Sequence, residues 1–113
     1  MTNLTDLDVD SITIAMTTQA MTADGAITIK EGVVTLSKDG VLAATLAAPT
    51  AGADDGKRLT IISLGTAANG AHTITSVSGA LVATFSKIIG DTLDLIAFNG
   101  RWEVVGFHQI TFA

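Results

Sequence analysis

Residues 93–107 constrain the fold more than any other part of the sequence, because two β-rich arms meet there at Asn99-Gly100. Asn and Gly tolerate the left-handed backbone angles that a two-residue hairpin turn requires. The turn sets the register of the two arms, so that alternate residues of each arm share one face. The second arm carries Trp102, the only tryptophan of the chain. This segment therefore predicts a β-hairpin.

Short β-type runs separated by glycine turns recur along the rest of the chain. In I-T-I-K, V-T-L-S and H-T-I-T-S-V, an aliphatic residue alternates with Thr or Ser, as in antiparallel strands that face a core on one side. The segment 15–23 is expected to form a turn, and helix is scarce. Strands are expected at residues 11–16, 26–30, 33–37, 41–46, 58–64, 72–77, 81–85, 92–98, 101–107 and 109–112.

A chain of 113 residues is enough for one domain with one core. We expect residues 11–113 to form a single all-β domain, either an antiparallel β-sandwich or a partly open β-barrel, with short glycine-turn hairpins. Both architectures produce alternating strands with glycine turns, so the pattern leaves the choice open. Pro49 lies in the segment 48–56, which we interpret as a loop between the halves of this domain.

The composition is apolar for an isolated domain. Hydrophobic residues make up 48% of the chain, mean hydropathy is +0.51 and charged residues make up only 15%, against roughly 25% in ordinary domains. No apolar run approaches the roughly 18 residues of a membrane-spanning helix, and residues 1–10 do not resemble a secretory signal. Membrane association is not expected. Self-association is the remaining way to cover apolar surface.

Net charge and residue types exclude several other functions. The chain has a net charge of −5, and its six basic residues form no cationic stripe, so nucleic acid is not an expected partner. The absence of cysteine excludes disulfides and thiolate chemistry. Neither of the glycine-rich patterns that bind nucleotide phosphates occurs. We therefore expect no cofactor.

Catalytic and metal sites have only weak candidates. His72 and His108 lie on different expected strands, and a triad needs a nucleophile, a base and a carboxylate that meet in space. We favour a strand-end role bonded to the backbone for His72, and an edge or subunit-contact role for His108. Asp6, Asp8 and Asp10 alternate and could hold calcium, but they lack an EF-hand pattern. An acidic arm over residues 1–10 is the favoured interpretation, with no metal site.

Two other polar motifs have a structural interpretation as well. In Asp54-Asp55-Gly56-Lys57, the aspartates can bond backbone amides of a turn and Lys57 can offset their charge. A turn is therefore favoured over an ion site. Trp102 could stack on a sugar, but a single Trp in an alternating strand is favoured as a packing anchor, either in the core or at a subunit contact.

Residues 46–105 bring these motifs together. The stretch contains L-A-A-P-T-A-G-A-D-D-G-K-R-L-T-I-I-S-L, A-H-T-I-T and F-S-K-I-I-G-D-T-L-D-L-I-A-F-N-G-R-W-E-V-V. It resembles small virion proteins of tailed bacteriophages, namely head decoration (cement) proteins and related trimeric fibre modules. The resemblance implies a structural protein without enzymatic activity or cofactor. It also implies a homotrimer that binds the major capsid protein on the capsid surface, after synthesis in the host cytoplasm.

The arm at residues 1–10 is expected to order on binding and reach a neighbour or the shell. Its deletion should abolish capsid binding and leave the oligomer intact. A trimeric tail or head fibre module that attaches to a host surface is the alternative function, and a hydrolase with His72 or His108 beside a carboxylate is a third. The candidate interface residues are Leu4, Leu7, Trp102, Phe107, His108 and Phe112.

Overall fold

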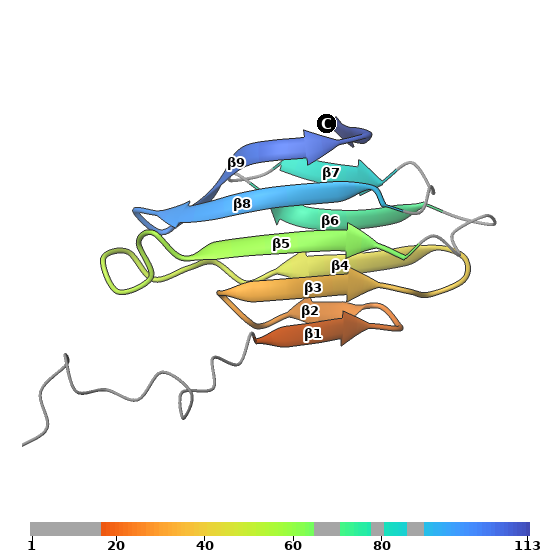
Figure 1. Ribbon diagram of the computed structural model, residues 1–113, viewed down its shortest axis with the longest axis horizontal. Coiled ribbons are helices and arrows are strands. Elements are labelled where there is room, and N and C mark those ends of the chain that lie inside the picture. Colours follow the sequence, from red (N-terminus) through yellow and green to blue (C-terminus); the bar gives the residue numbers. More distant parts are fainter. Residues whose placement is uncertain (1–16, 65–70, 78–80, 86–89) are drawn as a thin grey trace, which may run out of the picture.

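The computed structural model describes residues 17–64, 71–77, 81–85 and 90–113. These residues form two five-stranded sheets that pack face to face (Figure 1). Sheet A contains, in spatial order, β1 (Thr18–Met21), β3 (Gly32–Leu36), β5 (Arg58–Ser63), β8 (Thr92–Phe98) and β9 (Arg101–His108). Sheet B contains β10 (Ile110–Phe112), β7 (Leu81–Phe85), β6 (His72–Val77), β4 (Leu42–Leu46) and β2 (Gly25–Ile27).

The chain crosses between the sheets at every step from β1 to β6. Strands β1, β3 and β5 are therefore parallel neighbours in sheet A, and β2, β4 and β6 are parallel neighbours in sheet B. From β6 onward the pairing is antiparallel: β7 pairs with β6, β8 with β5, β9 with β8 and β10 with β7. The molecule thus has two halves. In the coiled half, β1 to β6, the chain winds from one sheet to the other and the strands pair in parallel; in the other half the strands pair antiparallel.

The all-β sandwich is confirmed, and the sheets do not form a closed barrel. The expectation of purely antiparallel sheets was wrong for β1 to β6. Alternation of apolar and polar residues reports only that one face of a strand is buried. Since each strand in the coiled half also has one face on the core, parallel pairing leaves the same pattern in the sequence.

The predicted strands agree well with the structure where alternation is strong. Strands β6, β7 and β8 begin and end at the predicted residues, and β3, β4, β5, β9 and β10 differ by one residue at one or both ends. Strand β2 is shorter than predicted. The turn expected over 15–23 was wrong, because Thr18–Met21 forms β1. The predicted strand at 11–16 and the acidic arm at 1–10 lie outside the described residues.

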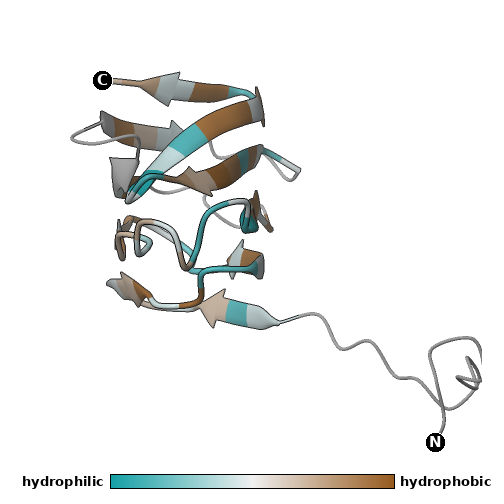
Figure 2. Cartoon of the chain, turned by 90° about the vertical axis from the view of Figure 1, so that its left-hand side faces the viewer, coloured by the Kyte–Doolittle hydropathy of each residue, from teal (hydrophilic) through white to brown (hydrophobic). Residues whose placement is uncertain are grey.

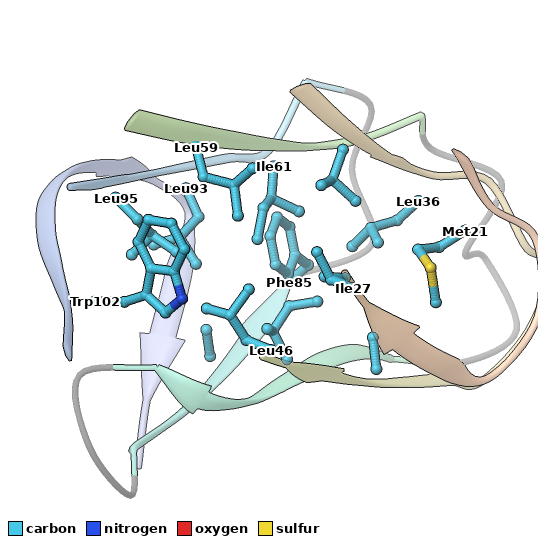
Figure 3. Packing of buried hydrophobic residues seen from close by; sticks show 14 of the residues in the cluster. Met21, Ile27, Leu36, Leu46, Leu59, Ile61, Phe85, Leu93, Leu95 and Trp102 are labelled. Atoms are coloured by element: carbon cyan, nitrogen blue, oxygen red, sulfur yellow. The ribbon is translucent and has the colours of Figure 1, made fainter. Parts of the chain in front are cut away.

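One core fills the space between the sheets. Seen along the strands, the sheets form two columns in which hydrophobic residues recur (Figure 2). Trp102 lies at one end of this core with Leu93 and Leu95, Met21 lies at the other end, and Phe85 lies between them (Figure 3). Each of these side chains is at most 6% exposed. The remaining large members of the core are Ile27, Val34, Leu36, Leu42, Leu46, Leu59, Ile61, Ile74 and Ile110.

The corner that leads into β3 depends on a glycine. Gly32 has a φ of 118°, and a Cβ atom there would collide with the carbonyl group of Thr17. The close approach allows the amide of Val33 to donate to the Thr17 carbonyl oxygen (3.0 Å) at the start of the β1–β3 ladder. Only glycine combines this backbone conformation with such contact.

Candidate interaction surface

The β8–β9 hairpin has the predicted turn. Asn99 and Gly100 have φ values of 53° and 78°, the left-handed pair that a type I′ turn requires. The Asn99 amide also donates to Asp55 Oδ1 at 2.8 Å. This bond ties the hairpin tip to the loop that precedes β5, 44 residues earlier in the chain.

The D-D-G-K motif is a turn whose charges are internally compensated. The Asp54 side chain is 9% exposed; its Oδ2 accepts from the Thr50 amide (2.7 Å), and its Oδ1 lies 2.9 Å from Lys57 Nζ. Lys30 Nζ lies 3.5 Å from Oδ2. The Thr50 amide first, and then Lys57, lower the pKa of Asp54 to about 2. The favoured interpretation as a turn with charge compensation therefore describes this loop.

Trp102 anchors the hairpin to the opposite sheet. Its indole is 1% exposed, and Nε1 donates to the Ala47 carbonyl oxygen at 2.9 Å. Trp102 belongs to sheet A, whereas Ala47 directly follows β4 of sheet B. Of the two roles considered for this residue, the structure shows packing in the core, and the ring is not on the surface where a partner could reach it.

Strand β9 forms one edge of sheet A and contains a bulge. Leu95 pairs with Val104 while Asp94 pairs with Gly106, so Val105 is an extra residue in the ladder. The Val105 side chain is 49% exposed. A bulge at an edge disturbs the regular row of backbone groups that another strand would need for pairing. Contact with a partner at β9 is therefore expected through side chains.

An aromatic pair closes the space between the edge strands β9 and β10. The rings of Phe107 and Phe112 meet edge to face, with centroids 5.1 Å apart and planes at 83°. Phe107 is 58% exposed, Phe112 is partly buried and His108 is exposed beside them. Gln109, with a φ of 57°, forms the corner between the two strands. Three of the predicted interface residues thus lie together at this end of the molecule.

Three of the exposed large apolar side chains lie on the β8–β9 hairpin. Phe98, at the end of β8, is 63% exposed, and Phe107 and Val105 of β9 are 58% and 49% exposed. The other two large apolar residues exposed in the described part of the chain are Val41 and Leu64. Phe98 and Val105 were not predicted as interface residues. Their outward direction follows from strand parity for Phe98, whereas the bulge at Val105 leaves no signal in the sequence.

The buried polar residues do not form a catalytic triad. Ser63 and His72 are fully buried, as is Asp91, whose carbonyl oxygen accepts from the Ser63 amide (2.9 Å). Among the described residues, no hydrogen bond joins Ser63 Oγ to His72 Nδ1, although a triad requires a bond between nucleophile and base. His72 Nε2 instead donates to the Lys38 carbonyl oxygen (2.8 Å). His72 therefore has the expected strand-end role.

Comparison with protein families, with curated proteins and with solved structures found no match. Within the described ranges, no three His, Asp or Glu side chains gather where they could hold a metal ion. The same part of the chain contains no helix long and apolar enough to span a bilayer. Leu4 and Leu7, the remaining predicted interface residues, lie outside the described residues. The exposed apolar side chains of the β8–β9 hairpin are therefore the strongest candidate site.

Proposed function

We propose that this protein is a structural virion component of a tailed bacteriophage that binds the outer surface of the capsid as an oligomer and stabilises it. The observation that carries the proposal is the exposure of Phe98, Val105 and Phe107 on one hairpin. Phe98 and Phe107 lie near opposite ends of this hairpin, and exposed apolar side chains on a rigid element are positions that a partner protein can cover. The resemblance of residues 46–105 to decoration and fibre proteins supports a capsid protein as the partner.

The hairpin is well suited to present these side chains. Trp102 fixes its second arm to Ala47, and Asp55 fixes its tip, so the exposed residues stand on a braced element. Burial of one phenylalanine against a partner contributes roughly 2 kcal/mol before the costs of association are deducted. A contact of this size is weak for one chain. It becomes effective when several copies in one oligomer bind the same shell.

A fibre module is the second candidate, and the coiled half of the fold favours it. Strands β1 to β6 alternate between two sheets and stack in parallel, an arrangement that solenoid proteins extend into elongated shapes. Such a module would attach to a host surface and not to a capsid. The two candidates therefore differ in the particle that the protein binds.

Co-sedimentation separates the candidates. Expanded, DNA-free heads lacking this protein would be mixed with the purified chain, with unexpanded heads and host cells as parallel samples. The decoration function predicts saturable binding to expanded heads and a higher temperature of head disruption. Phe98→Ala combined with Phe107→Ala should weaken that binding, whereas Thr18→Ala, on the distant strand β1, should not. Binding to host cells alone would reject the decoration function in favour of the fibre module.

A further inference from the structure

The charged residues of the strands are distributed very unequally between the two sheets. The strands of sheet A carry Arg58, Asp94, Arg101 and Glu103, whereas the five strands of sheet B contain no Asp, Glu, Lys or Arg. The chain as a whole has a net charge of −5. An uncharged sheet in an acidic chain marks a surface on which copies can approach without like-charge contact.

The outward residues of sheet B are small and regularly placed. One row crosses β4, β6, β7 and β10, and a second crosses β2, β4 and β6, with neighbouring strands about 4.8 Å apart. No described outward side chain in these rows is larger than valine. We call this surface the threonine face. It consists of the seven row residues Ala26, Ala43, Thr45, Thr73, Thr75, Thr84 and Thr111, together with Val82, the other partly buried outward residue of β7.

Two of these threonines turn their hydroxyl groups toward their own sheet. Thr73 Oγ1 donates to the Leu42 carbonyl oxygen at 3.4 Å, and Thr75 Oγ1 donates to the Ala44 carbonyl oxygen at 3.3 Å. These two hydroxyl donors of β6 are thus already bonded to carbonyl groups of β4. Burial of a polar group costs little when its hydrogen bond is retained. The part of the threonine face formed by Thr73 and Thr75 can therefore be covered by another protein surface at low desolvation cost.

A polar pair lies at the border of this face. Lys38 Nζ is 3.4 Å from Asp24 Oδ1, and the same carboxylate oxygen accepts from the amide of Ala43 at 2.9 Å. The charges are thus placed beside the rows and not within them. An uncharged centre with a polar rim is the usual composition of a protein interface.

We infer that the threonine face is the surface through which copies of this chain contact one another. Near a rotation axis, every side chain lies close to the same side chain of another copy, so a charge there would meet its own sign. The absence of charge from sheet B satisfies this condition, and small side chains let sheets pack closely. Phosphate-bearing partners are disfavoured because these strands carry no Lys or Arg.

The inference rests on the proposed function only for the existence of an oligomer. Sheet B then makes contacts between copies, while the hairpin of sheet A is left for the capsid. The two contacts use different residues, so they can be disrupted separately. Loss of the oligomer and loss of head binding are measured in different experiments, and each can fail while the other succeeds.

The test places one charge on each sheet. Thr45→Lys puts a lysine in the second row of the threonine face, between β2 and β6, and Thr35→Lys puts one on the outer face of β3 in sheet A. Light scattering coupled to size exclusion should show a wild-type mass of at least two chains of 11.5 kDa each. Thr45→Lys should raise the dissociation constant at least about 10-fold, and Thr35→Lys should leave it unchanged. Fluorescence of the buried Trp102 verifies that both variants fold.

A second measurement does not depend on disrupting the oligomer. The chain contains no cysteine, so Thr45→Cys and Thr35→Cys each provide a single site for a spin label. Dipolar spectroscopy should give a shorter distance between labels at position 45 than between labels at position 35. A monomeric wild-type chain at all accessible concentrations would overturn the inference. Dissociation by Thr35→Lys alone, or a shorter distance at position 35, would overturn it as well.

Discussion

The two ends of the sandwich are closed by different chemistry. At the end formed by the edge strands β1 and β2, the Gln19 side chain lies between the sheets. Its Nε2 donates to the Ala26 carbonyl oxygen (2.9 Å), and its Oε1 accepts from the amides of Thr28 (2.9 Å) and Ile29 (3.3 Å). Met21 is packed behind it in the core. A single amide thus satisfies three backbone groups of the chain around β2.

The end formed by β9 and β10 is closed by aromatic rings. Phe107 and Phe112 meet edge to face, and more than half of the Phe107 side chain is still exposed to solvent. Within the described residues, both the nitrogen and the oxygen of the Gln19 side-chain amide have hydrogen-bond partners in the same chain. The aromatic closure leaves apolar surface on Phe107 that the described residues do not cover. Because of this difference, we propose the β9–β10 end, and not the β1–β2 end, as the one that meets a partner.

Replacement of Trp102 by alanine should have the largest effect on the antiparallel half. The substitution removes a fully buried ring and leaves the Ala47 carbonyl oxygen without its donor. We expect a loss of about 3–5 kcal/mol in the free energy of unfolding, as for other buried aromatic residues. Urea denaturation followed by circular dichroism measures this loss. Trp102→Phe is the control, because it retains most of the packing and should cost less than half as much.

Replacement of Gln19 by alanine should have an intermediate effect, confined to the other end. Several hydrogen bonds are lost, but they are partly exposed, so we expect a loss of about 1–2 kcal/mol. Hydrogen exchange should accelerate at the amides of Thr28 and Ile29 and stay unchanged in β8 and β9. The matched control is Thr18→Ala, which alters the neighbouring outward residue of β1. Equal effects of the two substitutions would show that the amide does not close this end.

Gln19 also illustrates what the sequence could not show. The segment T-Q-A-M of β1 has no aliphatic alternation, and its inward glutamine looks like a surface residue until the partners around β2 are known. In contrast, the segments H-T-I-T of β6 and T-L-D-L of β8 alternate, and both strands were predicted to the residue. Local patterning therefore predicted elements well. It could not predict contacts between distant segments.

In the candidate site, too, local features were predicted from the sequence and long-range contacts were not. The Asn99-Gly100 turn is encoded by two adjacent residues, and it was predicted correctly. The bond from Trp102 to Ala47 spans 55 residues, and the bond from Asn99 to Asp55 spans 44. Such bonds depend on how the sheets stack, which alternation does not specify. Parallel pairing of β1 to β6 was missed for the same reason.

Replacement of Phe107 by alanine should separate stability from binding. Because the ring is 58% exposed, the loss of its edge-to-face contact should cost less than about 1.5 kcal/mol of stability. Binding to expanded heads should also weaken, by roughly the 2 kcal/mol that burial of one phenylalanine contributes in each copy, as measured by co-sedimentation. Phe98→Ala is the control for stability alone, because this ring is also exposed but has no ring contact among the described residues. The contrast between the two ends would be reversed if Phe107→Ala destabilised the chain more than Gln19→Ala and left binding intact.

Acid should produce the smallest effect, and two carboxylates allow the loop at the hairpin tip to be compared with the β1–β2 end. Asp54 supports the loop against the hairpin, with a side chain 9% exposed, and Asp24 lies beside β2, with a side chain 60% exposed. The Thr50 amide and Lys57 lower the pKa of Asp54 from 3.8 to about 2, and the Ala43 amide lowers the pKa of Asp24. Both groups therefore contribute stability when they are ionised.

The sign of the pH dependence follows from the lowered pKa of Asp54. Between pH 3.8 and about 2 the unfolded chain binds more protons at this carboxyl than the folded chain, so its contribution is lost as the pH falls through that window. Urea midpoints measured across the window should fall less steeply for Asp54→Asn than for wild type. Asp24→Asn should change the slope less, because solvent screens an exposed pair. A larger change for Asp24→Asn would mean that the β1–β2 end, and not the loop at the hairpin, is the more sensitive to acid.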